Sequence, residues 1–220
     1  MKSRIFSSQA YFSIERETLA LLKLESDFLS PNTLGSTRAA GDAIQDILAL
    51  RFESILGNWV SEYSTDFARR AMADLAFRDI DGNYYIIDVK SHRTSTKFNM
   101  PNLTSVERLA RLYEDDMNYF VLLMVQYDLQ GADADFSRVY FVPIEFLSWD
   151  CLTVGALGWG QIQIANSNNI LVNHQYSRKQ WMLQLCEVML EFYPKEIAKI
   201  GDRLRRFEEI KAHWLSKSED

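Results

Sequence analysis

The sequence is poor in cysteine, proline and glycine, and each shortage excludes a class of protein. Its two cysteines, Cys151 and Cys186, cannot build a disulfide framework, and neither lies in a CxxC or histidine-rich segment that would bind zinc. With 4 prolines and 9 glycines among 220 residues, the chain is neither collagen-like nor of low complexity. These counts predict a globular protein of a reducing, cytoplasmic compartment.

Long hydrophobic runs are also missing. No stretch reaches the roughly 18 apolar residues of a membrane span, and the first residues lack the apolar core of a secretory signal. We therefore expect a soluble protein without a membrane partner. Acidic residues outnumber basic ones, and the net charge of −6 weighs against a partner that is recognised by charge alone. A nucleic-acid partner would require a local basic surface.

Hydrophobic periodicity predicts an α/β fold in which helices flank a central mixed β-sheet, with residues 1–220 in a single domain. Helices are expected at 9–29, between Ser36 and Leu56, at 105–115 and over 177–215, the last interrupted at Pro194. Strands are expected on both sides of Asp81-Gly82 and at 119–129, 138–144 and 161–164. The core would span about 39–145, followed by a C-terminal helical region.

The most informative residues are Asp74, Asp88 and Lys90, in the hairpin predicted around Asp81-Gly82. Because side chains alternate along a strand, Asp88 and Lys90 share one face, while the apolar residues beside them point to the core. If the hairpin closes with a three-residue loop, Ile80–Gly82, Asp74 lies opposite Asp88. Two carboxylates and one ammonium group then occupy one patch.

Two neighbouring carboxylates repel each other unless a cation bridges them or one is protonated. Mg²⁺ suits such a pair, because it prefers oxygen ligands, keeps several waters and can activate one of them against phosphorus. Lys90 could orient or deprotonate that water and neutralise developing charge. The alternative is an ordinary solvated strand end, since an isolated Asp-x-Lys is common.

The order of these features resembles the PD-(D/E)XK nuclease core, with Ala73 in place of the usual proline before the first Asp. The run DVKSHRTSTKFNMPN, residues 88–102, is similar to the catalytic strand and following loop of the HincII/EcoRV-like branch of Type II restriction endonucleases. Shorter resemblances lie at Ala39–Asp42, in GWGQIQI and in SRKQW. Together they span most of the chain and imply a restriction-endonuclease-like fold.

The resemblance implies a Type II restriction endonuclease of a restriction-modification system. Such an enzyme hydrolyses phosphodiester bonds of double-stranded DNA at a short palindromic sequence, requires Mg²⁺, with Mn²⁺ as a substitute, and leaves 5′-phosphates. It implies Asp74, Asp88 and Lys90 as catalytic residues, and Asp74, Asp88 and the Val89 carbonyl as metal ligands. It makes Asp42 a candidate metal-site acid, either a ligand of a second metal ion or an acid behind the direct ligands, and the alternative is an acid in the first turn of a helix.

From Val89 to Ser105 the chain has no acidic residue. This segment could therefore form the local basic surface that a protein of net negative charge needs to bind nucleic acid. The candidate DNA-contacting residues of this segment are Ser91, His92, Arg93, Thr94, Lys97, Asn99 and Asn102. By the resemblance, Asn99 and Asn102 are the candidates for base recognition. The alternative is a polar surface loop in which Asn102 caps the next helix.

A palindromic site presents two equivalent phosphates, which favours a homodimer. The helix at 9–29 is the candidate dimerisation element, because it carries leucines and a tyrosine that could be exposed. Two rival functions remain: a structure-specific repair or recombination nuclease, and a DNA-binding module with a vestigial nuclease site. No small-molecule cofactor is expected.

Overall fold

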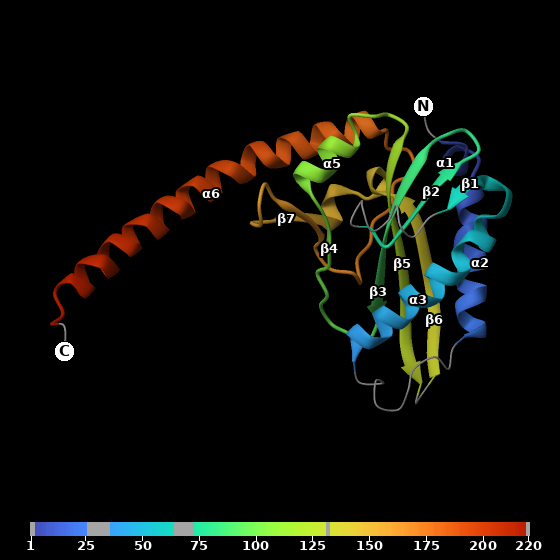
Figure 1. Cartoon of the computed structure of the whole chain (residues 1–220), viewed down its shortest axis with the longest axis horizontal. Helices are drawn as coiled ribbons and strands as arrows, with labels where there is room; N and C mark the ends of the chain where they lie inside the picture. Colours follow the sequence, from blue (N-terminus) through green and yellow to red (C-terminus); the bar gives the residue numbers. More distant parts are fainter. Residues whose placement is uncertain (1–2, 26–35, 64–72, 131–132, 219–220) are drawn as a thin grey trace. The chain divides into compact units, whose positions relative to one another are not determined.

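The computed structural model describes residues 3–25, 36–63, 73–130 and 133–218, and the chain divides into two compact units, Met1–Gln175 and Tyr176–Asp220 (Figure 1). The first unit is built on a five-stranded sheet with the strand order β1-β2-β3-β5-β6. These strands are β1 (Val60–Tyr63), β2 (Leu75–Asp79), β3 (Tyr84–Arg93), β5 (Asn118–Gln130) and β6 (Asp133–Pro143). Strands β3 and β5 are parallel and the other pairs are antiparallel, so the predicted mixed sheet is confirmed.

Strand β5 is the centre of the core. Its residues 119–125 are all buried, as the nearly continuous apolar run predicts for a strand covered on both faces. Three helices pack on the sheet: α2 (Ala10–Leu24) on β6, α3 (Thr37–Leu56) on β3 and α2, and α5 (Val106–Leu112) on β5. The short elements are α1 (Arg4–Ser7), η1 (Gly57–Trp59), η2 (Ile144–Phe146) and η3 (Trp149–Cys151).

The apolar faces of the two long helices point to this sheet. In α3, Ile44, Leu48 and Phe52 recur at intervals of four and are buried, as predicted. In α2, Tyr11 and Leu22 are buried as well and belong to the core of their own subunit, whereas Leu24 is 83% exposed at the end of the helix. Residues 26–29 of the predicted helix lie outside the described residues.

A second sheet of three strands was predicted only in part. Its order is β4 (Asn102–Ser105), β8 (Gln161–Ile164) and β7 (Leu152–Gly155), and only β8 was expected. Asn102 therefore begins a strand, and the expectation that it caps a helix is wrong. The N-cap of α5 is Ser105, whose hydroxyl accepts a hydrogen bond from the Arg108 N–H.

The second unit consists largely of one helix, α6 (Arg178–Leu215), which begins with a capping box between Ser177 and Gln180. The predicted interruption at Pro194 is wrong, because the helix continues through it. A proline removes one hydrogen bond and kinks a helix, but good helix formers on both sides can carry the helix past it. In the described part of the chain, no helix is both long and apolar enough to cross a membrane.

Candidate active site

The β2–β3 hairpin has the predicted register. Leu75 pairs with Ile87, and the loop is Ile80–Gly82. The strand pairing ends at Leu75, and the Asp74 N–H just before it donates to the Ile87 carbonyl at 3.1 Å, so Asp74 lies beside the β3 segment that carries Asp88. The hairpin thus places both acids at its open end, next to Lys90 of β3.

Asp88 is a buried carboxylate that is only half satisfied. Its side chain is 14% exposed, and Oδ1 accepts a hydrogen bond from the Lys90 ammonium at 2.6 Å. The buried Oδ2 finds no hydrogen-bond partner within the described ranges. Burial raises the pKa of Asp88 from 3.8 to about 7, the Lys90 charge opposes that rise, and the Asp74 carboxylate adds to it.

Two neighbours hold the carboxylate of Asp74 in place. Oδ1 accepts a hydrogen bond from Nε2 of Gln45 on α3, and Oδ2 accepts one from the Val89 N–H, both at 2.7 Å. Each carboxylate oxygen has a second lone pair, so both can still accept another partner. The sequence did not predict a role for Gln45, although it lies one turn after Asp42 on α3.

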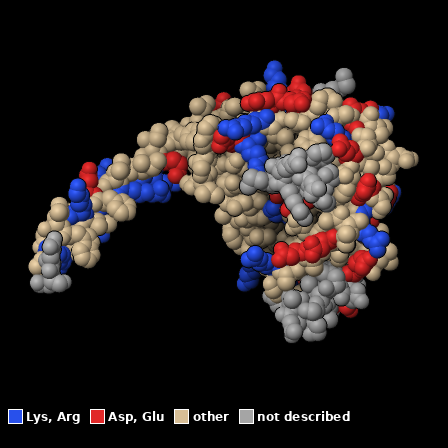
Figure 2. Space-filling view, viewed as in Figure 1, with Lys and Arg blue, Asp and Glu red and all other residues tan. Residues whose placement is uncertain are grey.

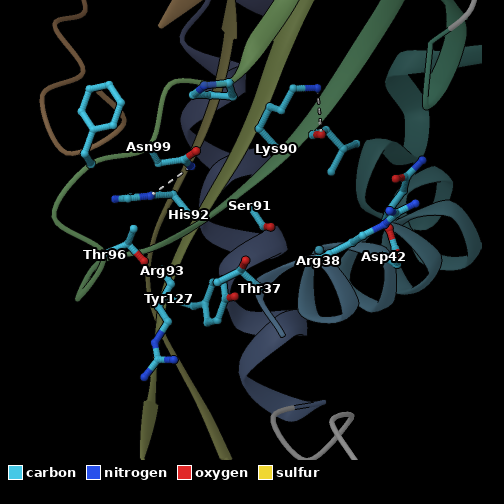
Figure 3. Close-up of a pocket in the computed structure, with 15 residues that line it drawn as sticks. Thr37, Arg38, Asp42, Lys90, Ser91, His92, Arg93, Thr96, Asn99 and Tyr127 are labelled. Atoms are coloured by element: carbon cyan, nitrogen blue, oxygen red, sulfur yellow. Dashed lines mark hydrogen bonds between the residues drawn. The ribbon is translucent and has the colours of Figure 1, made fainter. Parts of the chain in front are cut away.

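Lys90 completes the group. Its side chain is 24% exposed, and Nζ lies 2.6 Å from Oδ1 of Asp88. Nζ also lies 3.5 Å from the Val89 carbonyl oxygen (Figure 3). The backbone carbonyl that the resemblance implies as a metal ligand therefore lies beside the two acids. Arg108 of α5, which sequence reasoning also missed, favours the charged form of Asp88 and works against the rise in its pKa.

Asp42 lies on the same side of the molecule but does not join the pair. It is exposed on α3, five residues after the first helical residue, Thr37, and the first turn contains no acid. The reading of Asp42 as a first-turn acid is therefore wrong. In the described ranges no three His, Cys, Asp or Glu side chains cluster in a way that could hold a metal ion. A site here would consist of two carboxylates, a carbonyl and water.

A cavity of about 490 Å³ opens beside Lys90 (Figure 3). Its walls are the start of α3, the end of β3 and the loop that follows β3, with Tyr127 from β5. At Gly41, α3 approaches β3 closely, since a Cβ there would lie 3.0 Å from the Ser91 hydroxyl oxygen.

The acid-free segment after Lys90 is less positive in three dimensions than in the sequence. His92 is 1% exposed, and its ring nitrogens lie 2.8 Å from Oδ1 of Asn168 and 3.4 Å from Nδ2 of Asn99. Arg93 forms an ion pair with Asp128 of β5 at 3.2 Å. His92 therefore anchors the loop, and Arg93 has a protein partner, neither of which the sequence revealed.

The backbone N–H of Leu129 and the hydroxyl of Ser95 lower the pKa of Asp128, so this acid remains charged beside the segment. Figure 2 shows Lys and Arg mixed with Asp and Glu over the described part of the visible face. The exposed residues among the candidate DNA contacts are Thr94, Lys97 and Asn102. Asn102 accepts a hydrogen bond from Gln163 of β8 at 2.6 Å, and this pair offers amide groups at the surface.

Comparison of the chain with protein-family models and with curated proteins finds no match.

Proposed function

We propose that the protein is a Type II restriction endonuclease with a PD-(D/E)XK-like site, which hydrolyses double-stranded DNA with Mg²⁺. The observation that carries the proposal is the buried Oδ2 of Asp88, which has no partner in the described chain although it lies beside a second carboxylate. A purely structural carboxylate would be costly in this state, because a buried polar group needs a partner. A cation would supply that partner.

The residues at the site fit a hard divalent ion. Asp74, Asp88 and the Val89 carbonyl offer only oxygen atoms, and Mg²⁺ is commonly held by one or two carboxylates together with water. Mn²⁺ accepts similar ligands and would substitute for it. When bound, the ion would polarise the phosphodiester and lower the pKa of a water molecule.

The side chains of the site would provide the remaining functions. Gln45 and the Val89 N–H fix the direction of the Asp74 carboxylate. Lys90 holds its ammonium group at the carboxylate of Asp88, where it can stabilise negative charge that develops on the phosphate and transfer a proton. The products would be a 5′-phosphate and a 3′-hydroxyl.

DNA would approach from the side of the cavity. Arg38 at the start of α3 lines this cavity, and Lys97 is exposed in the loop whose residues Thr96 and Phe98 line it, so both suit phosphate contacts. The Asn102–Gln163 pair and Asn99 carry the amide groups that can read base edges. Because a short palindrome presents one phosphate on each strand, we propose that two subunits act together.

The test is to digest a fully sequenced phage DNA with the purified protein, in Mg²⁺ and in EDTA, and to map the ends. Discrete fragments that share one short sequence, formed only in Mg²⁺, are expected. Cleavage that follows DNA shape would favour the structure-specific nuclease instead. Binding to DNA without any cleavage, in Mg²⁺ or in Mn²⁺, would contradict the proposal and favour the vestigial module.

A further inference from the structure

Helix α6 carries a heptad repeat over most of its length. Starting at Leu183, positions at alternating intervals of three and four residues are apolar as far as Trp214, with one exception, Lys211. In heptad notation these are the a and d positions. The a positions are Leu183, Leu190, Ile197, Leu204 and Lys211, and the d positions are Cys186, Tyr193, Ile200, Phe207 and Trp214.

The stripe is exposed to solvent. Leu190, Ile197, Leu204, Phe207 and Trp214 are each between 62% and 70% exposed. Apart from Lys211, the charged residues lie outside the stripe, and the ion pairs between residues three or four apart use the b, c, f and g positions. An apolar stripe of this length with a charged opposite face is typical of a coiled-coil helix. Such a stripe is stable when it is buried against another apolar surface.

We propose that α6 of one chain forms a parallel, in-register, two-stranded coiled coil with α6 of a second copy. A second copy matches the stripe because it presents the same heptads. The repeat from Leu183 to Trp214 would run for about 48 Å at 1.5 Å per residue. This inference rests on α6 alone and does not depend on nuclease activity.

The charges beside the stripe select the parallel orientation. In a parallel pair, Arg203 at a g position faces Glu208 at the next e position of the partner, which gives two opposite-charge pairs. In an antiparallel pair that aligns the same stripe, Glu196 would face Arg203 of the partner, but Glu187 would face Glu208, so two repulsive pairs would offset the two attractive ones. A single Lys at an a position, as at Lys211, is a known determinant of register.

The area available is sufficient for a stable pair. Phe207 and Trp214 from both chains would together remove on the order of 600 Å² from water. The exposed leucines and isoleucines of the stripe bring the total into the range of about 1,200–2,000 Å² that specific interfaces bury. Pairing would also stabilise the last turns of α6, because an isolated helix of this kind is marginally stable in water.

The first test is the mass of the full chain in solution, measured in EDTA and without DNA. The wild type should have twice 25.6 kDa at micromolar concentration. The double variant Leu204→Glu, Phe207→Glu should have 25.6 kDa. The control Ala198→Glu, Ala212→Glu adds the same charge at exposed b positions and should remain a dimer.

Circular dichroism and thermal unfolding show whether the double variant keeps a folded first unit, so a monomer is not mistaken for a misfolded chain. A wild type that is monomeric at every concentration would overturn the proposal. A dimer that survives Leu204→Glu, Phe207→Glu would overturn it as well, because the interface would then lie elsewhere. Neither outcome depends on whether the protein cleaves DNA.

The second test determines the orientation through Cys186, an exposed cysteine at a d position. In the parallel pair the two Cys186 thiols face each other, so a short bis-maleimide should link the chains. In the antiparallel pair Cys186 faces Lys211, and the thiols lie about 37 Å apart along the axis. Linking that disappears in Cys186→Ser supports the parallel pair, since Cys151 is buried, and a dimer that cannot be linked overturns it.

Discussion

Two buried aspartates lie at opposite ends of the same hairpin, and their surroundings differ. Asp79, at the loop end, is 1% exposed and accepts four hydrogen bonds: Oδ1 from the Asp81 and Asn83 N–H groups, and Oδ2 from the Asn83 amide and the Tyr85 hydroxyl. At the open end, Oδ1 of Asp88 accepts a hydrogen bond from Lys90, and Oδ2 has no hydrogen-bond partner in the described chain.

The difference separates a structural acid from a candidate catalytic one. The donors around Asp79 come from the loop and strand that it stabilises. Both of its carboxylate oxygens therefore have hydrogen-bond partners within the hairpin. The carboxylate of Asp88 is buried at a cost, and its pKa is raised to about 7. Acids whose burial is not compensated by the protein itself cluster at functional sites, because the ligand supplies the missing partner.

The largest expected effect is on catalysis at Asp88. Asp88→Asn keeps the shape of the side chain but weakens its interaction with a divalent ion, and cleavage of DNA in Mg²⁺ should fall by about 1,000-fold or more. The free energy of unfolding in EDTA should not decrease. Initial rates on the mapped substrate and urea unfolding measure the two quantities. A variant that cleaves at the wild-type rate would contradict the assignment.

The same substitution at Asp79 should lower stability and leave cleavage nearly unchanged. In Asp79→Asn an NH₂ group replaces an oxygen that accepts hydrogen bonds, so at least one buried donor loses its partner. We expect the free energy of unfolding to fall by about 3 kcal/mol. Well below the melting temperature, cleavage should stay within about threefold of the wild type. Loss of cleavage in a folded Asp79→Asn protein would break the comparison.

The two acids also predict a pH dependence of stability in EDTA. The native state keeps the proton of Asp88 up to about pH 7, whereas the unfolded chain loses it near pH 4. The cost of ionising Asp88 is therefore absent below about pH 4, grows as the pH rises, and is complete above pH 7.

Asp88→Asn removes that cost. Its gain in unfolding free energy over the wild type should be about 2 kcal/mol larger at pH 8 than at pH 5. Urea unfolding of both proteins at the two pH values measures this. A gain that is equal at both values would show that burial does not hold the pKa of Asp88 high.

A smaller effect is expected at Gln45, which holds the carboxylate of Asp74 from α3. Gln45→Leu removes the 2.7 Å hydrogen bond and should lower the rate of cleavage by about 10-fold to 100-fold. If the residue acts through Asp74, the variant should also need more Mg²⁺ for half of its maximal rate. A lower rate with an unchanged Mg²⁺ requirement would exclude that positioning role.

The smallest effect should come from Lys97, which is exposed and acts through charge alone. Lys97→Gln should weaken DNA binding only severalfold and reduce the slope of log K against log salt by about 1. Fluorescence anisotropy in Ca²⁺ at several salt concentrations measures both. Thr94→Ala, also exposed in the same loop, is the control and should leave the slope unchanged.

The sequence was sufficient to predict the parts of the fold that local patterns determine. The Asp81-Gly82 signal and the alternation in IIDVK predicted the hairpin register, which is confirmed from Leu75 to Arg78 and brings Asp74 to the open end near Asp88. The apolar run of β5 likewise predicted a strand that is covered on both faces.

Contacts between distant segments could not be predicted in this way. Nothing in the acid-free run indicates that Asp128 neutralises Arg93 or that Asn168 fixes His92, because both partners come from other parts of the chain. Gln45 was missed because an uncharged residue on an acidic helix face gives no pattern. The heptads of α6, in contrast, are a local pattern in the sequence, and Pro194 at an e position does not interrupt them.

The central claim is that Oδ2 of Asp88 has no hydrogen-bond partner among the described residues because a divalent cation is its partner. Electron paramagnetic resonance of Mn²⁺ titrated into folded wild type, Asp88→Asn and Asp79→Asn measures this directly, because bound Mn²⁺ loses the signal of the free ion. We expect the wild type and Asp79→Asn to bind Mn²⁺ in the millimolar range or tighter, and Asp88→Asn to bind it at least about 10-fold more weakly. Equal binding by Asp88→Asn and the wild type would contradict the claim.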